Sequence, residues 1–572
     1  MDLSIMLHLF LLLCSLITVL WACPDRCLCR ENKILCNSIS DFPTAVPSST
    51  TTFYIANANI YSLKPEDMTD FANALNMFVV RNTVLREVRP GTFDSTINLG
   101  ALGFTSNELQ DVPEDLFQNL LKLESLTLNS NQLLVLRPRW FSSLSALKTL
   151  DLGKNLFTSI PVETFHPLTD LQYLTLAGNN ISQLSRDTFK GLTKLKTLRL
   201  NKNSIGEIPA GTLDDLVDLD ELSLHDNLIT HLHPKLFSKT QNLQKLFLSH
   251  NQLKVLPEGI FLHLPKLAQI SLYENQLESL LPGVFGPMAL NQLWLYDNKL
   301  SRLEDNTFWN LTQLHLLVLS RNQISYVSSE AFRGLEQVGE VSLHTNFLTT
   351  LEAGTFKYLP NLVNISLEHN FISTLPSGFL QGLNHLGQMD LRNNSLPNLP
   401  QNILEELTMV KEVLLQQNPW RCDQDILPLR DWMIQYPSKV NHSLVVCNTP
   451  SNLSGEVIAL LTDEDLMPLS STKEPTPTTT EKRRKPNTPS PTKRSTASPA
   501  VEATPTSGQG EDTSGGPVVE GAESKGTLIL IIVIAVVCTL IICSIIGCCV
   551  CWRRNKRGSR NLGRRNKNNS VL

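Results

Sequence analysis

The sequence has no cysteine between Cys36 and Cys422, which excludes disulfides from that long stretch. Cysteines flank it instead. A C-x3-C-x-C-x6-C cluster of Cys23, Cys27, Cys29 and Cys36 precedes the stretch, and Cys422 and Cys447 follow it. This distribution suits a chain that folds in an oxidising compartment, with disulfides closing both ends of the stretch. A zinc site in the first cluster is the alternative.

The sequence also lacks a recognisable set of catalytic side chains, so we predict no enzymatic activity, no cofactor and no metal site. His231 and His233 form an H-x-H pair, but Leu232 between them falls at an inward-facing position. The chain has a net charge of −5, and its last residues, 553–572, contain eight basic residues and no acidic one. The preceding residues therefore carry −13, and an acidic exterior argues against nucleic acid as a partner.

Charged residues are absent from 527–551, a run of 25 residues. At ~1.5 Å per residue a helix of this length crosses the ~30 Å hydrocarbon core of a membrane. The basic tail, 552–572, then places the C-terminus in the cytosol. Residues 1–22 are typical of a secretory signal peptide, although no basic residue precedes the apolar run. We therefore predict a single-pass plasma-membrane protein with an extracellular N-terminus.

The predicted tail is too short to hold a signalling domain. Cys548, Cys549 and Cys551 lie at the inner leaflet, where palmitoylation is one interpretation and apolar filler is the other. The C-terminal residues Ser570, Val571 and Leu572 match a weak PDZ-domain ligand pattern.

Asparagine recurs fourteen times from Asn107 to Asn418. Twelve of the thirteen steps are 24 residues, and the step from Asn275 to Asn298 is 23. Each asparagine closes an L-x-x-L-x-L-x-x-N pattern, in which Leu-x-Leu predicts a short strand with one buried face. This pattern at this period is typical of a leucine-rich repeat. Phenylalanine stands ten residues after most of these asparagines, and we expect that column to fill the convex side of each coil.

The repeats predict an α/β solenoid, a horseshoe whose parallel sheet lines the concave side, with about sixteen coils over 53–417. Cysteine-containing caps are expected at 23–52 and 418–466. In the second cap Ile426, Leu429 and Trp432 fall at helical spacing and would seal the last coil. Residues 467–526 are rich in Ser, Thr and Pro and predict an extended stalk.

A ligand site is predicted from the residues that point to the concave face. Most are small or polar, but Phe247, Trp294 and Val318 are not, and the next exposed column adds Tyr273 and Tyr296. Exposed aromatic side chains with a charged rim, here including Arg321, are the usual composition of a protein-binding site. Aromatic filler on a long sheet is the alternative.

Glycosylation sequons favour the same place. The N-x-S/T sequons of the predicted exterior are Asn180, Asn310, Asn364, Asn393, Asn441 and Asn452. We expect Asn364 and Asn393 at exposed strand positions, where glycans would shield the later coils. The predicted ligand contact therefore centres on the coils from Phe247 to Arg321.

A resemblance to a known family rests on four segments: GVFGPMALNQLWLYDNKL, VLSRNQISYVSSEAFRGL, SLHTNFL and NPWRCDQDILPLRDWM. Over roughly 23–447 the chain resembles the family of leucine-rich repeat-containing protein 15, whose more distant relatives are platelet glycoprotein V and the regulatory subunit of carboxypeptidase N. The resemblance implies a plasma-membrane glycoprotein that binds matrix proteins such as collagen, laminin or fibronectin and supports cell adhesion and migration. Segment 281–290 departs from it by being one residue short.

The resemblance also implies two disulfides in the first cap, Cys23–Cys29 and Cys27–Cys36. Many C-terminal caps of this kind carry a further cysteine where this chain has Gln424, so a single Cys422–Cys447 bond is expected there. The alternative function is a co-receptor for an immune or growth-factor ligand without its own signalling domain. A regulatory subunit that carries an enzyme is a third interpretation, which the predicted membrane span disfavours.

Overall fold

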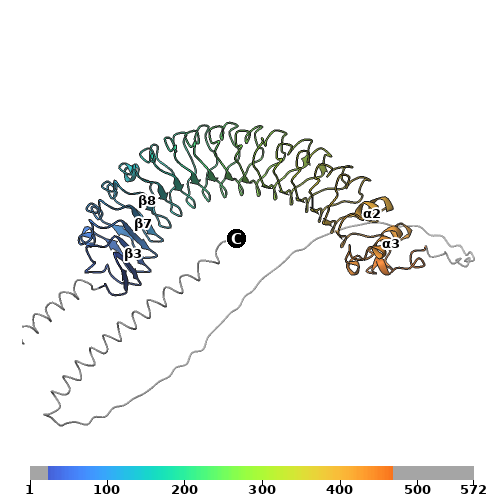
Figure 1. The fold of residues 1–572 in the computed structure, drawn as a ribbon, viewed down its shortest axis with the longest axis horizontal. Helices are drawn as coiled ribbons and strands as arrows, with labels where there is room; N and C mark the ends of the chain where they lie inside the picture. The colour runs from blue at the N-terminus through green and yellow to red at the C-terminus, as the bar shows by residue number, and fades with distance from the viewer. Residues whose placement is uncertain (1–22, 468–572) are drawn as a thin grey trace, which may run out of the picture. The chain divides into compact units, whose positions relative to one another are not determined.

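The computed structural model describes residues 23–467, which form a curved solenoid with one continuous sheet on its inner side (Figure 1). An antiparallel pair, β1 (Cys27–Arg30) and β2 (Lys33–Asn37), begins the sheet. From β2 onward each strand pairs in parallel with the next. The predicted signal peptide, the membrane span, Cys548, Cys549, Cys551 and the C-terminal Ser570, Val571 and Leu572 lie outside the described residues. In residues 23–467 no helix has both the length and the apolar character that a membrane span requires.

The sheet has 18 strands, so sixteen follow the β1–β2 pair. These are β3 (Thr52–Ala56), β5 (Met77–Arg81), β7 (Ala101–Thr105), β8 (Ser125–Thr127), β9 (Thr149–Asp151), β10 (Tyr173–Thr175), β11 (Thr197–Arg199), β12 (Glu221–Ser223), β13 (Lys245–Phe247), β14 (Gln269–Ser271), β15 (Gln292–Trp294), β17 (Leu316–Val318), β19 (Glu340–Ser342), β20 (Asn364–Ser366), β21 (Gln388–Asp390) and β22 (Glu412–Leu414). Two small parallel sheets lie beside it: β4 (Ser62–Leu63) with β6 (Glu87–Val88), and β16 (Arg302–Leu303) with β18 (Tyr326–Val327).

The repeated asparagines join each coil to the one before it. Asn251 shows the pattern. Its Oδ1 accepts a hydrogen bond from the Ile229 backbone N–H at 3.0 Å, and its Nδ2 donates to the Leu224 carbonyl at 3.0 Å and to its own coil's Leu248 carbonyl at 3.1 Å. Twelve of the fourteen asparagines are buried, and Asn179 and Asn203 are partly exposed. The side-chain amide thus satisfies backbone groups that the tight turn after each strand leaves unpaired.

The predicted phenylalanine column forms a stack inside the coils. Phe237, Phe261 and Phe285 continue one another at centroid distances of 6.1 and 5.9 Å, and the stack extends to Phe356. A second stack joins Phe141, Phe165 and Phe189.

The α/β part of the fold prediction is wrong, because the return segments of most coils are turns. Hydrogen bonds between residues three apart dominate them, as from the Leu264 N–H to the Phe261 carbonyl. A 24-residue coil leaves room for little more than one or two helical turns between strands. The exception among the coils is α2 (Gln401–Leu407), which follows Pro400 in the last repeat (Figure 1). Short 3-10 turns occur at Pro65–Met68 and Pro138–Phe141.

The single 23-residue step is absorbed on the outer side of the solenoid. Asn298 makes the ladder contacts of its neighbours, accepting from the Leu277 N–H and donating to the Leu272 carbonyl, both at 3.0 Å. Strands β14 and β15 keep the common register, with Ser271 opposite Trp294. The coil directly before Trp294 is therefore shortened between Phe285 and Leu290, on its outer side, while its strand keeps the common geometry.

Three disulfides close the two ends of the solenoid: Cys23–Cys29, Cys27–Cys36 and Cys422–Cys447. All four cysteines of the first cluster are therefore used, which excludes the zinc alternative. In the C-terminal cap Ile426 ends the 3-10 turn Gln424–Ile426, and α3 (Leu427–Gln435) follows. Trp432 of α3 is buried and donates its indole N–H to the Thr408 hydroxyl of the last repeat at 3.1 Å.

Candidate ligand-binding site

Four of the six residues predicted to bind ligand line one hollow on the concave sheet. The hollow has a volume of about 360 Å³ and crosses strands β12 to β15. Its lining consists of His225, Phe247, Ser249, Gln269, Ser271, Tyr273, Trp294 and Tyr296, and we call it the aromatic hollow. The common register of the strands brings these residues together, because each occupies one of three equivalent positions in its coil.

Two tyrosines form one side of the aromatic hollow. The rings of Tyr273 and Tyr296 stack with centroids 4.5 Å apart and planes within 7°. His250 packs edge-on against Tyr273 at 5.4 Å and pairs with Glu274, with 2.8 Å between Nδ1 and Oε2. These contacts fix the rings before any ligand arrives, which lowers the entropy that binding must offset.

A cation closes the same side. The Arg321 guanidinium lies 5.6 Å from the centre of the Tyr296 ring and forms an ion pair with Asp297. Val318, the remaining predicted residue, is half-buried in β17, one strand beyond the hollow. Both residues thus border the aromatic hollow, and the structure does not place them in its lining.

Small residues form the floor of the hollow. Ser249 and Ser271 are buried, and the Ser271 hydroxyl donates to the Ser249 hydroxyl at 3.4 Å. Because both side chains are short, the larger rings of Phe247, Tyr273 and Trp294 rise around a gap. Gln269 and Ser249 were not predicted. Gln269 is the first residue of β14, and the residues at this position of successive strands also line the concave face, so comparing them would have indicated Gln269.

Two titratable groups of the hollow, His225 and Tyr296, have pKa values shifted toward the neutral form. Burial lowers the pKa of His225 below its usual 6.5, although Asp226 opposes the effect. Burial, with Tyr273 next in importance, raises the pKa of Tyr296. His225 packs edge-on against Phe247 at 6.2 Å, and its buried Nδ1 has no hydrogen-bond partner among the described residues. At neutral pH the hollow is an uncharged aromatic surface with polar edges.

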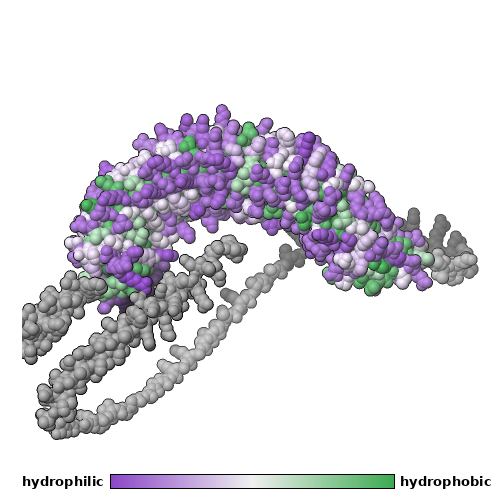
Figure 2. All heavy atoms as spheres, in the orientation of Figure 1, coloured by the Kyte–Doolittle hydropathy of each residue, from purple (hydrophilic) through white to green (hydrophobic). Residues whose placement is uncertain are grey.

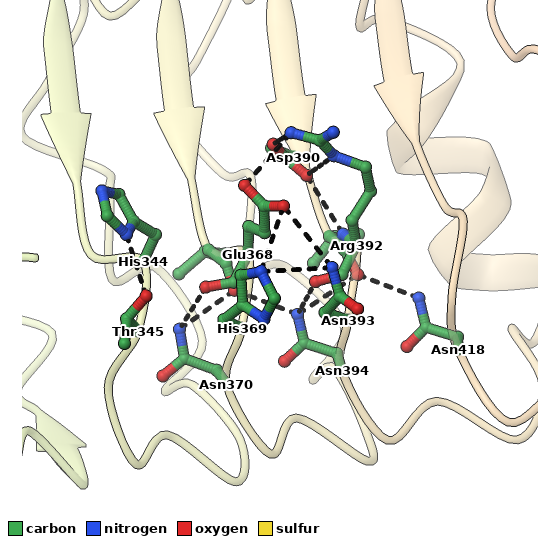
Figure 3. A network of polar contacts seen from close by, with 12 residues as sticks. His344, Thr345, Glu368, His369, Asn370, Asp390, Arg392, Asn393, Asn394 and Asn418 are labelled. Carbon is green, nitrogen blue, oxygen red and sulfur yellow. Dashed lines mark hydrogen bonds and ion pairs between the residues drawn. The ribbon is translucent and has the colours of Figure 1, made fainter. Parts of the chain in front are cut away.

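The later coils present a different concave surface, on which the charges pair with one another (Figure 3). The Arg392 guanidinium lies between two carboxylates, 2.6 Å from Asp390 and 3.1 Å from Glu368. Asp390 is buried in β21, and its carboxylate accepts a second bond from the Arg392 side chain at 3.0 Å. These side chains therefore satisfy one another and leave little for a ligand to pair with.

Two sequons flank this charged cluster. Asn364 begins β20, a strand position as predicted, but it is half-buried rather than exposed. The expectation that Asn393 also occupies a strand position is wrong, because it lies beyond β21 with a φ of 50°, in the turn that precedes each ladder asparagine. Asn180, Asn441 and Asn452 are exposed and Asn310 is half-buried, and Asn310 donates from Nδ2 to the Phe285 carbonyl at 3.1 Å. Whether the six sequons are occupied stays a prediction.

Other hollows lie elsewhere. One, about 680 Å³, is in the C-terminal cap and has Asp423, Asp425, Glu464 and Asp465 in its lining. Another, about 380 Å³, crosses β8 to β12 on the concave face. In residues 23–467, no group of three or more His, Cys, Asp or Glu side chains is placed to hold a metal ion. Figure 2 shows a largely hydrophilic surface on which hydrophobic patches are small and separate.

Comparisons with curated proteins give short segments of similarity. The chain is 35% identical to SLIT and NTRK-like protein 4 of Mus musculus over 60 residues, 10% of this chain and 7% of that protein. It is 29% identical to mouse nephrocan over 99 residues, 17% and 19% of the two chains. It is 42% identical to leucine-rich repeat-containing protein 15 of Homo sapiens over 45 residues, 8% of each. These segments span less than a fifth of each relative.

Solved structures share the fold over most of the chain. A leucine-rich repeat protein of Leptospira interrogans is 25% identical with a TM-score of 0.51, and the match covers 70% of this chain and 92% of that one. Toll of Drosophila, in its complex with Spatzle, is 18% identical with a TM-score of 0.51, covering 76% and 71%. At that identity the second likeness shows the fold alone.

A family model described as leucine rich repeat matches overlapping stretches of the chain: residues 73–133, 121–181, 171–229, 217–277, 241–299, 288–343, 336–396 and 360–419. Repeat solenoids of this kind are typically scaffolds for protein interactions rather than enzymes. Since the matched stretches run from 73 to 419, more than half of the sequence, the chain belongs to the leucine-rich repeat family.

Proposed function

We propose that this chain binds an extracellular protein ligand in the aromatic hollow on the concave face of its repeats. The observation that carries the proposal is the hollow itself, in which Phe247, Tyr273, Trp294 and Tyr296 surround two buried serines. Solvated aromatic side chains held in fixed positions are costly to leave in water and are favourable to cover. In protein interfaces such residues commonly contribute ~2 kcal/mol or more each.

The chain presents this hollow at the cell surface, as a single-pass protein with residues 23–526 outside. The signal peptide (1–22), the stalk (467–526), the membrane helix (527–551) and the basic tail (552–572) support that topology from the sequence. Glycans on Asn364 and Asn393 cover the later coils and leave the aromatic hollow open. Val318 and Arg321 contact the ligand at the border of the hollow.

A matrix protein such as collagen, laminin or fibronectin is the proposed ligand class, and adhesion and migration are the proposed cellular roles. The resemblance to the family of leucine-rich repeat-containing protein 15 supports this choice, as does the 45-residue segment that is 42% identical to its human member. Recognition through aromatic rings with one exposed arginine suits a ligand with apolar and acidic side chains.

One substitution can block the hollow with the cell's own glycosylation. Gln269→Asn creates an N-I-S sequon at the first position of β14, the same strand position that Asn364 occupies in β20 with the same three residues. Glu340→Asn creates an N-V-S sequon at that position of β19, beside the native sequon. The two variants therefore carry equivalent glycans, one inside the aromatic hollow and one in the later coils.

Full-length wild type and both variants are expressed on cells and tested against purified collagen, laminin and fibronectin and a panel of surface receptors. A mobility shift that is reversed by glycosidase verifies the added glycan. We expect Gln269→Asn to abolish ligand binding and Glu340→Asn to leave it intact. Binding that survives a verified glycan at position 269 contradicts the proposed site. Binding to a receptor and to none of the three matrix proteins favours the co-receptor function.

A further inference from the structure

A second hollow on the concave face has a basic lining. It has a volume of about 380 Å³ and lies on strands β8 to β12, immediately before the aromatic hollow. Its lining includes Lys154, Lys202 and Arg199, together with Asp151, Gly153, Ala177 and Gly178. We call it the basic hollow. His225 lines both hollows, so they meet at β12.

The basic hollow is open because glycine and alanine stand at positions where other coils carry large side chains. Gly153 and Ala177 stand in two successive coils at the position that Tyr273 and Tyr296 occupy in the aromatic hollow. Gly178 stands directly before a ladder asparagine with a φ of 70°, and a Cβ atom there would lie 3.3 Å from Cγ of Lys154. The aliphatic part of the Lys154 side chain therefore packs against the backbone of the next coil, in space that a side chain at position 178 would occupy.

Two carboxylates near the hollow, Asp151 and Glu221, are already engaged. Asp151 accepts hydrogen bonds from the Asn129 side chain at 2.7 Å and from the Gly153 N–H at 2.9 Å. Glu221 pairs with Arg199, with 2.9 Å between its Oε1 and the guanidinium. Arg199 also donates to the Tyr173 hydroxyl at 3.2 Å.

The two lysines are placed differently. Both are exposed, and neither forms an ion pair with a carboxylate of residues 23–467. They lie two coils apart, which is about 10 Å at the usual strand spacing. The backbone at both residues has a positive φ, 54° for Lys154 and 57° for Lys202, as at most equivalent positions of the ladder. The ammonium groups thus face a shared polar gap in which a carboxylate would find two cationic partners.

We propose that the basic hollow binds an acidic side chain of the same protein ligand whose apolar side chain occupies the aromatic hollow. This inference rests on the proposed function and specifies its ligand. From β10, at the middle of the basic hollow, to β13 and β14 is three to four strand steps, or about 17 Å. An extended segment at ~3.3 Å per residue covers that distance in about five residues. The ligand segment therefore crosses the strands with Asp or Glu about five residues from Phe, Trp or Leu.

A displayed library of random peptides, long enough to span both hollows, tests this recognition. Full-length protein in detergent micelles is the bait. Selected peptides are then measured against Lys154→Glu with Lys202→Glu, and against Trp294→Ala with Tyr296→Ala. Lys235→Glu with Lys239→Glu, two exposed lysines on a return turn, is the matched charge-reversal control. Lys154→Arg with Lys202→Arg keeps the charges and tests rescue.

We expect selected peptides to share an acidic and an apolar residue at the stated spacing. Reversal of Lys154 and Lys202 should weaken their binding by about tenfold or more, while the control and the arginine variants stay within about twofold of wild type. Peptides that lose binding with Trp294→Ala and Tyr296→Ala but bind the reversed lysines normally contradict this inference and leave the proposed function standing. Peptides whose binding is unchanged by both pairs of substitutions contradict both this inference and the proposed function. A selection that enriches no peptide for the wild type over the doubly substituted chains does the same.

Discussion

The rings of Tyr273 and Tyr296 stack 4.5 Å apart across the one step of the asparagine ladder that is a residue short. They can do so because the missing residue is taken from the outer side of the coil, while β14 and β15 keep their register. The parallel rings offer one flat aromatic edge to a ligand. This edge is produced by the rings and not by the hydroxyl groups.

Replacement of both tyrosines by phenylalanine should therefore leave ligand binding within about twofold of wild type. Tyr296→Ala removes the ring that Arg321 covers and should weaken binding by about tenfold or more. Affinities of the full chain for the matrix protein identified in the panel provide the measurement. A Tyr273→Phe, Tyr296→Phe chain as weak as Tyr296→Ala would show instead that the hydroxyl groups make the contacts.

Asn251→Ala should destabilise the solenoid strongly. The substitution leaves the buried Ile229 N–H without its partner, and the Leu224 and Leu248 carbonyls each keep one hydrogen bond, from Asn227 and Asn275. One unsatisfied buried group costs ~1–3 kcal/mol, so the free energy of unfolding should fall by about 1–3 kcal/mol. Asn119→Ala, at an exposed position, is the control and should change it by less than about 0.5 kcal/mol. Chemical denaturation measures both, and equal effects would contradict the structural role of the ladder.

Gly286→Ala should destabilise the short coil. A Cβ atom at Gly286 would lie 2.8 Å from Cα of Leu262, so one coil must move away from the other. We expect a loss of about 1–3 kcal/mol in the free energy of unfolding. Gly206→Ala is the matched control, because a Cβ atom there meets nothing within 4 Å. A similar cost at both positions would mean that the close approach of the two coils is not what requires glycine.

Loss of the Cys422–Cys447 disulfide should loosen the C-terminal cap first. The bond closes a 25-residue segment, and replacing both cysteines by serine should cost about 3 kcal/mol. Because each coil contacts only its neighbours, the loss should remain local. Hydrogen exchange should quicken in α3 and in the last repeat and stay unchanged near β10. Uniform quickening along the solenoid would show that the cap supports the entire array.

His225 should make the stability of the chain depend on pH. Burial lowers its pKa below 6.5, so the folded chain takes up this proton less readily than the unfolded chain. The contribution of a neutral His225 is therefore complete above pH 6.5 and is lost as the pH falls below that value. Denaturation of wild type and His225→Gln between about pH 5 and 8 should show that the free energy of unfolding of the wild type falls relative to the variant only on the acidic side. Parallel curves would contradict this assignment, and exposed His263→Gln controls for the substitution itself.

Much of this architecture is predictable because one repeated contact governs it. The asparagine spacing defines the parallel sheet and assigns every residue of a coil to a side. This is why Phe247, Tyr273, Trp294 and Tyr296, which come from three successive coils, could be predicted to lie together. The location of the short step was also readable, since Phe285 keeps its distance of ten residues from Asn275 and the deletion must follow it.

Features that depend on what is missing were harder to predict. The basic hollow exists because Gly153, Ala177 and Gly178 leave a gap, whereas the predicted ligand site rested on large side chains of the concave face. Ion pairs between charged side chains could not be predicted from the sequence either. In the sequence Arg392 is a cation that could bind a ligand, yet in the folded chain it forms ion pairs with Asp390 and Glu368. The prediction of an α/β solenoid implied helices in the coils, and among the described repeats only α2 is a regular α-helix.

The phenylalanine stacks inside the coils end at Phe189 and resume at Phe237, because Leu213 takes the ring's place between them. Leu213 lies in the coil that joins β11 to β12, where the basic and aromatic hollows meet. A branched aliphatic side chain yields to bending more readily than a column of rings in contact. We therefore expect the arc to flex at this coil, and the spacing between the two hollows to adjust to ligands of slightly different length.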